Sequence, residues 1–536
     1  MQMIFLFIQE ILQEHFAFIK RATIILSMER LSKIYSTVSH GLEAMLVEVE
    51  VDVGAGIPSL TIVGLPDKAV EESKERVRLA LKNSGFDFPQ KKIVVNLAPA
   101  NIKKEGPAYD LPIAIGILVA AGLIEEKKIS KTIFMGELSL GGEIKMTRAI
   151  VQAASLAKAK NFRLVIPAAN LEEASLVSGV AIYAPENLKD IYTAITESKS
   201  VFQISKKHEL EYQQDFADFD FKNIVGQAQA KRALEIAAAG GHNILLSGSP
   251  GGGKTLLSKS IVSILPQLTE QEMLEITKIY SVAGILSDKL PYIQIRPFRS
   301  PHHTTSAVAI IGGGTYPKPG EVSLAHKGVL FLDEFPEFPR MVLEALRQPL
   351  EDRVVTISRA QGSIEYPADF ILIAAQNPCP CGYLGDAKHE CTCSSTQIIS
   401  YKKRVSGPLL DRIDLNLQVE KIPLKNLKSK IIEEKSDVVR SRVEKARLIQ
   451  VDRSQKSLGR AKLNSSLSKN EIEQISPMSR ECEIMLEQAV EKLDLSMRSY
   501  LKLKRIARTI ADLEGSSDVH VSHIVESLQY RAKGNA

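Results

Sequence analysis

The chain contains no tryptophan, and only 6% of its 536 residues are aromatic. It also lacks an uninterrupted apolar run of the roughly 18 residues that a membrane-spanning helix needs, so no membrane association is expected. Lys and Arg number 68 against 63 Asp and Glu, and this near balance identifies no class of partner. The chain has only five cysteines, and four of them in one short window suit a metal site better than a disulfide framework. The composition predicts a globular, cytoplasmic protein.

The first residues are apolar, but we do not expect them to act as a signal peptide for export. Glu10, Glu14, Lys20 and Arg21 interrupt the apolar run, and no small-residue cleavage site follows. We expect Met28 to be the true start, so that within the N-terminal extension at 1–28 the first 27 residues are not translated. An amphipathic helix that binds a partner is the alternative.

A glycine-rich loop carries the strongest chemical signal: Gly248-Ser249-Pro250-Gly251-Gly252-Gly253-Lys254-Thr255. It lies between a short apolar run and a helix-like run, and its spacing is that of a Walker A loop. Glycines allow backbone N–H groups to face phosphate oxygens, Lys254 adds a positive charge, and Thr255 offers a hydroxyl to Mg²⁺. We predict that all eight residues bind ATP and Mg²⁺. A flexible loop with a chance Lys-Thr pair is the alternative.

Two later apolar runs each lead into polar residues that suit phosphate hydrolysis. Residues 328–332 precede Asp333 and Glu334, and residues 370–375 precede Gln376 and Asn377. Continuous apolar runs are typical of buried parallel strands, where ligands bind at the carboxyl ends. We predict that Asp333 holds Mg²⁺, that Glu334 orients and deprotonates the attacking water, and that Asn377 bonds the γ-phosphate or that water. A solvated Asp-Glu turn is the alternative.

Two arginines are candidate contacts to the transition state. Arg412 and Arg498 could offer forked donors to phosphate oxygens. Taken alone, each is better explained as an ordinary surface arginine.

Four cysteines form two C-x-C pairs directly after Asn377. The pairs Cys379, Cys381 and Cys391, Cys393 are separated by nine residues. Four soft ligands suit tetrahedral Zn²⁺, so we predict a structural zinc or a redox-sensitive clip. Ordinary reduced thiols are the alternative. Cys482 lies on an apolar helix face and is expected to pack in a core.

A basic stretch follows the core motifs. Residues 421–462 contain thirteen Lys or Arg against five Asp or Glu. Such a stretch could track phosphates, or it could form a solvated helix face with internal salt bridges.

The order of these motifs resembles the ComM/YifB family of magnesium-chelatase-like AAA+ ATPases over nearly all of residues 31–530. Its specific marks are FRSPHHT at 298–304, PGEVSLAH at 319–326, NPCPCG at 377–382, SGPLLDR at 406–412 and ARTIADLEG at 507–515. The resemblance implies Asn377 as sensor 1, Arg412 as a finger that reaches a neighbour's ATP, and Arg498 as sensor 2. It also implies a homo-hexameric ring that acts on branched or single-stranded DNA, as a branch-migration helicase in recombination during natural transformation.

The resemblance extends to the N-terminal half, which is similar to the proteolytic domain of Lon. Ala108 and Val151 stand near the positions of that enzyme's catalytic serine and lysine. Because a hydroxyl nucleophile and its activating base are both missing, we expect no peptidase activity.

The fold class that follows is α/β, with a P-loop AAA+ core built on a parallel sheet. We predict a Lon-protease-like α/β domain at 29–202, a linker at 203–220, the ATPase core with the cysteine cluster at 221–420, and a basic helical segment with a helical lid at 421–536.

Two segments are predicted to contact DNA if a ring encloses it. The first is a glycine-rich stretch that contains Lys318. The second is a hairpin expected over residues 354–366, with Arg353 at its base and Arg359 near its turn. His302 and His303 could join them, with a structural hydrogen-bonding pair as the equal alternative. A second hypothesis for the whole chain is a chelatase-type motor or chaperone that remodels a protein partner.

Overall fold

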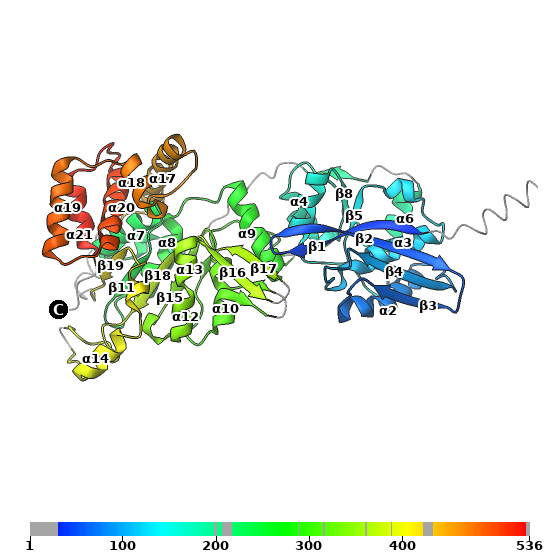
Figure 1. Ribbon diagram of the computed structural model, residues 1–536, viewed down its shortest axis with the longest axis horizontal. Coiled ribbons are helices and arrows are strands. Elements are labelled where there is room, and N and C mark those ends of the chain that lie inside the picture. The colour runs from blue at the N-terminus through cyan, green and yellow to red at the C-terminus, as the bar shows by residue number, and fades with distance from the viewer. Residues whose placement is uncertain are drawn as a thin grey trace, which may run out of the picture. The chain divides into compact units, whose positions relative to one another are not determined.

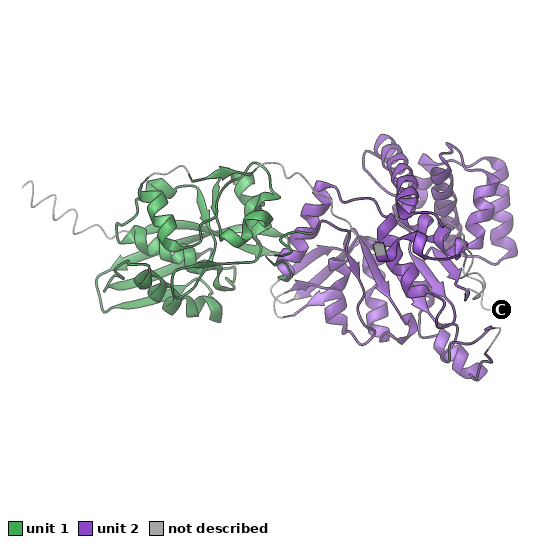
Figure 2. Ribbon diagram, turned by 180° about the vertical axis from the view of Figure 1, so that it is seen from behind, with its two compact units in different colours: residues 1–209, 284–292 green, residues 210–283, 293–536 purple. Residues whose placement is uncertain are grey.

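The computed structural model divides into two compact units, residues 1–209 with 284–292, and residues 210–283 with 293–536 (Figure 2). It describes residues 31–197, 201–205, 217–287, 289–314, 317–359, 362–386, 389–421 and 433–531. The predicted extension at 1–28 lies outside the described residues, as does most of the predicted linker. None of the helices within these ranges is both long and apolar enough to cross a membrane.

The first unit is built on an eight-stranded mixed sheet with the order β10-β9-β8-β5-β1-β2-β4-β3 (Figure 1). Strand β1 (Ser32–His40) pairs antiparallel with β2 (Glu43–Gly54). Every residue of helix α3 (Asp110–Ala120) is buried, as expected for a helix that is apolar on all sides. The other elements are β3 (Ser59–Val63), α2 (Lys68–Asn83), β4 (Lys92–Ala98), β5 (Thr132–Phe134), β6 (Glu137–Leu138), β7 (Ile144–Lys145), α4 (Ile150–Lys160), β8 (Arg163–Val165), α5 (Leu171–Ser175), β9 (Ala181–Tyr183), α6 (Leu188–Thr196) and β10 (Gln203–Ile204).

The boundary of this unit differs from the prediction. Strand β10, at residues 203–204, pairs antiparallel with β9 at the edge of the sheet. The Ser205 amide donates to the Val180 carbonyl at 2.8 Å. The first unit therefore extends past residue 202 into the predicted linker, because edge pairing with a distant strand outweighs the polar local composition.

The second unit contains a five-stranded parallel sheet with the order β12-β15-β18-β11-β19. Its strands are β11 (Ile244–Ser247), β12 (Phe298–Arg299), β15 (Val329–Leu332), β18 (Ile371–Gln376) and β19 (Leu415–Gln418). Leu332 pairs with Ala374, and Ser247 pairs with Gln376. The residues that follow β11, β15 and β18 therefore meet at one edge of the sheet, as predicted from their apolar runs.

Some helices of this unit pack on the sheet or beside it, and others form a separate lid. The helices before the lid are α7 (Ala228–Gly240), α8 (Lys254–Ile264), α9 (Glu270–Ala283), α10 (Ala307–Ile311), α11 (Glu321–Leu324), α12 (Arg340–Ala345), α13 (Arg347–Asp352), α14 (Ser395–Lys402), α15 (Gly407–Leu410) and α17 (Ser436–Leu458). Among them, α7 and α8 contact strands of the sheet. The lid contains α18 (Lys469–Ile475), α19 (Arg480–Lys492), α20 (Met497–Glu514) and α21 (Val521–Gln529). Cys482 is 2% exposed in the lid core, which confirms its predicted packing role. The predicted α/β class is also confirmed.

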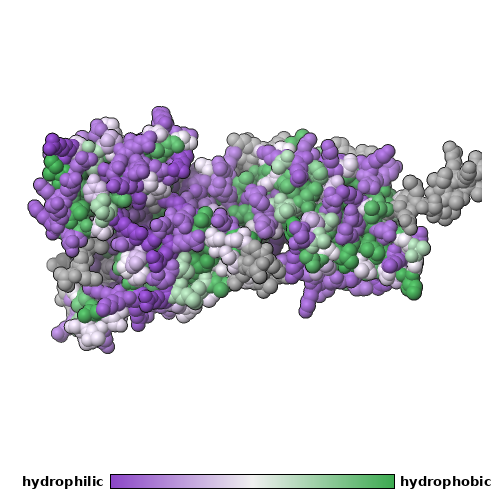
Figure 3. Space-filling model, in the orientation of Figure 1, coloured by the Kyte–Doolittle hydropathy of each residue, from purple (hydrophilic) through white to green (hydrophobic). Residues whose placement is uncertain are grey.

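The basic stretch is used for contacts inside the second unit wherever it is described. Arg442 pairs with Glu235 and Glu434, and Arg453 pairs with Asp512. Arg447 donates to the Ala238 carbonyl at 2.8 Å, and burial lowers its pKa to about 9. Hydrophilic side chains predominate over α17–α20 on the face shown in Figure 3. These contacts favour the salt-bridged helix face over a phosphate-tracking role for this part of the stretch.

Candidate nucleotide-binding site

The glycine-rich loop joins the end of β11 to the start of α8. Gly251 and Gly253 adopt φ angles of 78° and 86°, a region that side chains disfavour. A Cβ on Gly248 would overlap the Val419 carbonyl oxygen next to β19. Because Gly253 is the residue before α8, the free backbone N–H groups of the first helical turn face the loop, where anions are stabilised.

Lys254 is held at the centre of the site. Its Nζ donates to the Gly248 carbonyl at 2.6 Å, to the Ser249 carbonyl at 3.2 Å and to Asn377 Oδ1 at 3.1 Å. Burial lowers the pKa of Lys254, and the nearby Asp333 carboxylate opposes that effect. The structure thus brings together Lys254 and Asn377, which are far apart in the sequence.

Hard oxygen ligands face each other beside this lysine. Thr255 Oγ1 donates to Asp333 Oδ2 at 3.1 Å, so a hydroxyl and a carboxylate converge from α8 and from the end of β15. Such oxygens are the ligands that Mg²⁺ prefers, together with water and nucleotide phosphates. These residues therefore fit ATP with Mg²⁺, which Thr255 and Asp333 would hold.

Glu334 follows in a strained conformation. Its φ angle is 52°, which is uncommon for a non-glycine residue and clusters at functional sites. The Glu334 amide donates to Asp333 Oδ1 at 2.9 Å. The Glu334 side chain is 54% exposed, so its carboxylate is accessible to water.

His303 contacts Glu334, which sequence reasoning did not predict. His303 Nδ1 lies 3.1 Å from Glu334 Oε2. The His302 and His303 rings lie 4.1 Å apart, and His302 Nδ1 lies 2.9 Å from Thr304 Oγ1. His303 therefore adjoins the candidate nucleotide site, and only its position four residues after β12, the neighbour of β15, could have indicated this.

We expect the substitution His303→Ala to lower kcat for ATP hydrolysis by about 10-fold to 10²-fold, with little change in KM for ATP. The reason is that the imidazole positions the Glu334 carboxylate. Steady-state hydrolysis assays on this variant check the prediction, with His302→Ala as the matched control. Unchanged kcat in His303→Ala at saturating ATP would show that the contact has no part in catalysis.

The two candidate arginines lie apart from these residues. Arg412 forms an ion pair with Glu351 and donates to the Pro408 carbonyl at 2.7 Å. Arg498 is exposed in the first turn of α20. Within the described ranges, no hydrogen bond or ion pair joins either arginine to Lys254, Thr255, Asp333 or Glu334.

The turn that carries Arg412 is attached to the lid. Lys502 in α20 donates to the Ile413 carbonyl at 2.8 Å and to the Leu410 carbonyl at 3.5 Å. Burial lowers the pKa of Lys502. His242, next to β11, makes a second connection to the lid. Its Nε2 lies 2.9 Å from Thr509 Oγ1 of α20, and its Nδ1 lies 3.4 Å from Asp414 Oδ2.

The segments predicted to contact DNA are two hairpins that pack on each other. Strands β16 (Val354–Arg359) and β17 (Gly362–Pro367) form the predicted hairpin, and β13 (Gly312–Gly313) with β14 (Lys318–Pro319) forms a second. Tyr366 Oη donates to the Pro317 carbonyl at 2.8 Å. Lys318 is exposed beside this contact; the Arg359 side chain lies outside the described parts.

Arg353 has a different environment from the one predicted. Its guanidinium pairs with Asp369 and donates to Ser465 Oγ at 3.1 Å. Burial opposes ionisation of Asp369, but Arg353 and Lys327 outweigh it and lower the Asp369 pKa to about 2. These contacts favour a structural role for Arg353 at the base of the hairpin.

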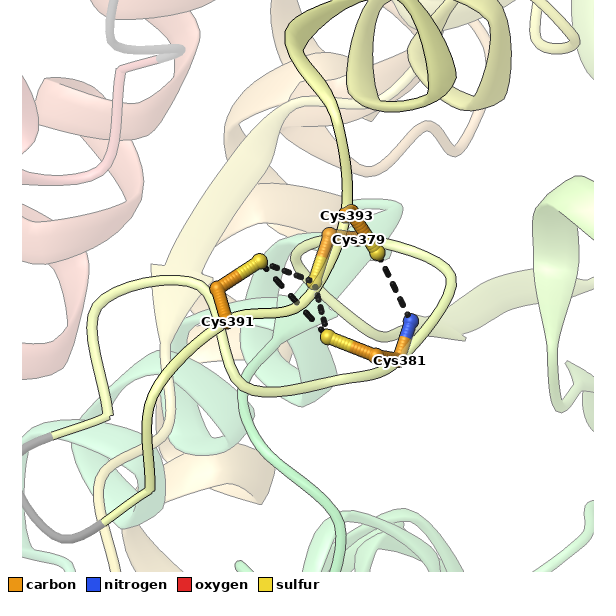
Figure 4. A group of neighbouring side chains, drawn as sticks. All are labelled: Cys379, Cys381, Cys391 and Cys393. Atoms are coloured by element: carbon orange, nitrogen blue, oxygen red, sulfur yellow. Dashed lines mark hydrogen bonds between the residues drawn. The ribbon is translucent and has the colours of Figure 1, made fainter.

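The predicted cysteine cluster comes together. One ligand atom from each of Cys379, Cys381, Cys391 and Cys393 lies within 4.8 Å of the others, close enough for a single metal ion (Figure 4).

Comparison with known proteins places the chain in a family. Three models of magnesium chelatase subunit ChlI match consecutive parts: residues 49–170, residues 220–427, and residues 433–531 for the ChlI C-terminal model. The chain is 42% identical to the competence protein ComM of Haemophilus influenzae over 508 residues, covering 94% of this chain and 97% of that protein. The chain belongs to the ComM/YifB family of magnesium-chelatase-like AAA+ ATPases.

Other relatives agree with this membership. The Escherichia coli protein YifB is 40% identical, with coverage of 94% of this chain and 97% of that protein. The magnesium-chelatase subunit ChlI of Cyanophora paradoxa is 21% identical and matches 58% of this chain and 88% of its own length. Membership in the ComM/YifB family implies ATPase activity with ATP and Mg²⁺.

Proposed function

We propose that this protein is a ring-forming motor that uses ATP hydrolysis to move branched or single-stranded DNA, as a branch-migration helicase in recombination during natural transformation. The observation that carries the proposal is the similarity to a competence protein over 94% of the chain, combined with the convergence of Lys254, Thr255, Asp333 and Asn377 at one sheet edge. Hydrolysis supplies the energy, and the two packed hairpins supply the surface for DNA.

Each residue at the sheet edge has a separate role in the proposed hydrolysis of ATP. The Walker A backbone and Lys254 bind the phosphates, and Thr255 and Asp333 hold the metal ion that neutralises phosphate charge. Glu334 accepts a proton from the attacking water, and His303 keeps its carboxylate in place. Asn377 contacts Lys254, which supports its proposed role in contacting the terminal phosphate.

A hexameric ring of identical chains completes each site in this proposal. Arg412 pairs with Glu351 in its own chain, away from the Walker residues. A neighbouring chain's ATP is therefore the proposed target of Arg412, as in other motors that supply an arginine in trans. Arg498 is proposed as sensor 2 and approaches the nucleotide when the lid closes.

DNA binding is proposed for the surface of the two hairpins, with Lys318 and Arg359 as its positive charges. We expect the double substitution Lys318→Ala, Arg359→Ala to weaken binding of a four-way DNA junction and to reduce the salt dependence of binding, because phosphate contacts release counterions. Fluorescence anisotropy with a labelled junction at several salt concentrations measures both effects.

The matched control for this experiment is Lys456→Ala. Lys456 is an exposed lysine of α17 that pairs with Asp452, away from the hairpins. Equal binding by the hairpin variant and the control would refute the assigned DNA surface. In the same preparations, junction-stimulated ATP hydrolysis by the unsubstituted chain tests the motor itself.

A chelatase-type motor or chaperone that remodels a protein partner is the second candidate. It is favoured by the similarity to magnesium-chelatase subunits over more than half of the chain. A rate of ATP hydrolysis that is the same with and without every form of DNA would support this candidate over the DNA motor.

A further inference from the structure

The four clustered cysteines have the geometry of a site for a single metal ion. The sulfur of Cys379 lies 3.4 Å from that of Cys381 and 3.6 Å from that of Cys391, and the Cys381 and Cys391 sulfurs are 3.6 Å apart. Zinc bound to four thiolates at about 2.3 Å places neighbouring sulfurs about 3.8 Å apart. The spacing of these three sulfurs therefore suits one tetrahedral ion, and the Cys393 sulfur, within 4.8 Å of the other three, can supply the fourth ligand.

Backbone donors also surround the sulfurs. The Leu384 amide donates to Cys379 Sγ at 3.3 Å. The Cys381 amide donates to Cys393 Sγ at 3.4 Å, a bond that Figure 4 shows. Such donors stabilise thiolate charge and orient metal ligands. Cys379 is fully buried, so the site is shielded from water on one side.

The cluster lies between two regular elements of the ATPase core. Cys379 follows the end of β18 and Asn377, and Cys393 directly precedes Ser394, which caps α14 with a reciprocal pair of hydrogen bonds to Gln397. A metal ion would therefore link the exit of the Asn377 strand to the start of a helix, in a stretch with few apolar residues to hold it.

The turn inside the cluster touches the Walker A loop. Gly382 has a φ angle of 83°, and a Cβ built there would lie 2.7 Å from Pro250 Cδ and 3.8 Å from Asn377 Cγ. Farther along the turn, Asp386 accepts a hydrogen bond from Lys421 Nζ at 2.7 Å. The Lys421 ammonium also lies 5.5 Å from the centre of the Tyr383 ring. Pro250 and Asn377 are both predicted nucleotide contacts.

We propose that Cys379, Cys381, Cys391 and Cys393 bind one Zn²⁺, and that this ion fixes the Gly382 turn against Pro250 so that metal occupancy sets the affinity of the Walker A loop for nucleotide. Metal binding and local folding are coupled in sites of this kind. The inference rests on the nucleotide site of the proposed function and is independent of DNA.

The first test measures metal content in the full chain, purified without a histidine tag and without chelators. Elemental mass spectrometry is expected to find one zinc per chain, and to find none in the double variant Cys391→Ser, Cys393→Ser. The control Cys482→Ala, which removes the buried thiol of the lid, is expected to keep the zinc. Iron, or no metal together with four reactive thiols in this loop, would overturn the assignment of zinc.

The second test measures the dissociation constant of a fluorescent ATP analogue with Mg²⁺. We expect it to rise by about 10-fold or more in the double variant and to stay unchanged in Cys482→Ala. Because the double variant could fail to fold, the unsubstituted chain is also stripped with a zinc-selective chelator and reloaded with zinc, and affinity is expected to fall and then recover. Unchanged affinity after zinc loss would overturn the link to the Walker A loop, whether or not DNA stimulates hydrolysis.

Discussion

Replacing Glu334 by Gln is expected to lower kcat for ATP hydrolysis by about 10²–10⁴-fold, while ATP still binds. The amide keeps the size of the side chain but cannot accept a proton from water. The contact from His303 and the unusual backbone of Glu334 distinguish this carboxylate as the proposed base.

Steady-state hydrolysis and binding of a fluorescent ATP analogue separate the two effects of this substitution. The matched control is Glu337→Gln, because Glu337 is a nearby, partly exposed carboxylate that pairs with Arg404. A comparable loss in the control, or near-normal turnover in Glu334→Gln, would contradict the role given to Glu334.

Arg412→Ala is expected to lower ATP hydrolysis by about 10³–10⁵-fold under conditions where the chain assembles. In the proposed ring, the guanidinium supplied by the neighbouring chain would stabilise charge in the transition state, and alanine cannot replace it. Hydrolysis is measured together with oligomeric state by analytical ultracentrifugation, so that loss of assembly is distinguished from loss of chemistry. Arg404→Ala, which removes another arginine paired with a glutamate, is the control.

A mixing experiment tests whether Arg412 acts between chains. Glu334→Gln and Arg412→Ala chains are each expected to be inactive alone, yet a mixture would contain interfaces with an intact Glu334 on one side and an intact Arg412 on the other. Recovered hydrolysis in mixed assemblies supports action in trans. Mixed assemblies that remain inactive would place the role of Arg412 within its own chain, where it pairs with Glu351.

The parts of the fold that were predictable from the sequence are those with local patterns. The loop at 248–255, the apolar strands that lead to Asp333 and Asn377, and the hairpin at 354–366 all have their signals within a few residues. It was also foreseeable that the strands leading to Asp333 and Asn377 end at one edge, since parallel strands bring their carboxyl ends together. The positions of Lys254, Thr255, Asp333 and Asn377 relative to one another follow from these rules.

The remaining features depend on contacts between residues far apart in the sequence. No local pattern shows that His303 reaches Glu334, or that Gly382 packs on Pro250. The local excess of positive charge at 421–462 also gave no indication that Glu235 and Asp512, from other helices, would pair with its arginines. Strand β10 was missed for the same reason, because its partner β9 defines it and its own sequence is polar.

The hydrogen bonds from Lys502 to the carbonyls of Ile413 and Leu410 have a consequence for the order in which subunits of the proposed ring would hydrolyse ATP. Because the lid helix α20 holds the turn that presents Arg412, a lid that rotates when its own subunit binds or releases nucleotide would shift that arginine as well. In a ring, the nucleotide state of one subunit would thereby set the catalytic readiness of the next. ATP hydrolysis would then pass from subunit to subunit around the ring. Its direction would depend on which neighbour receives the arginine.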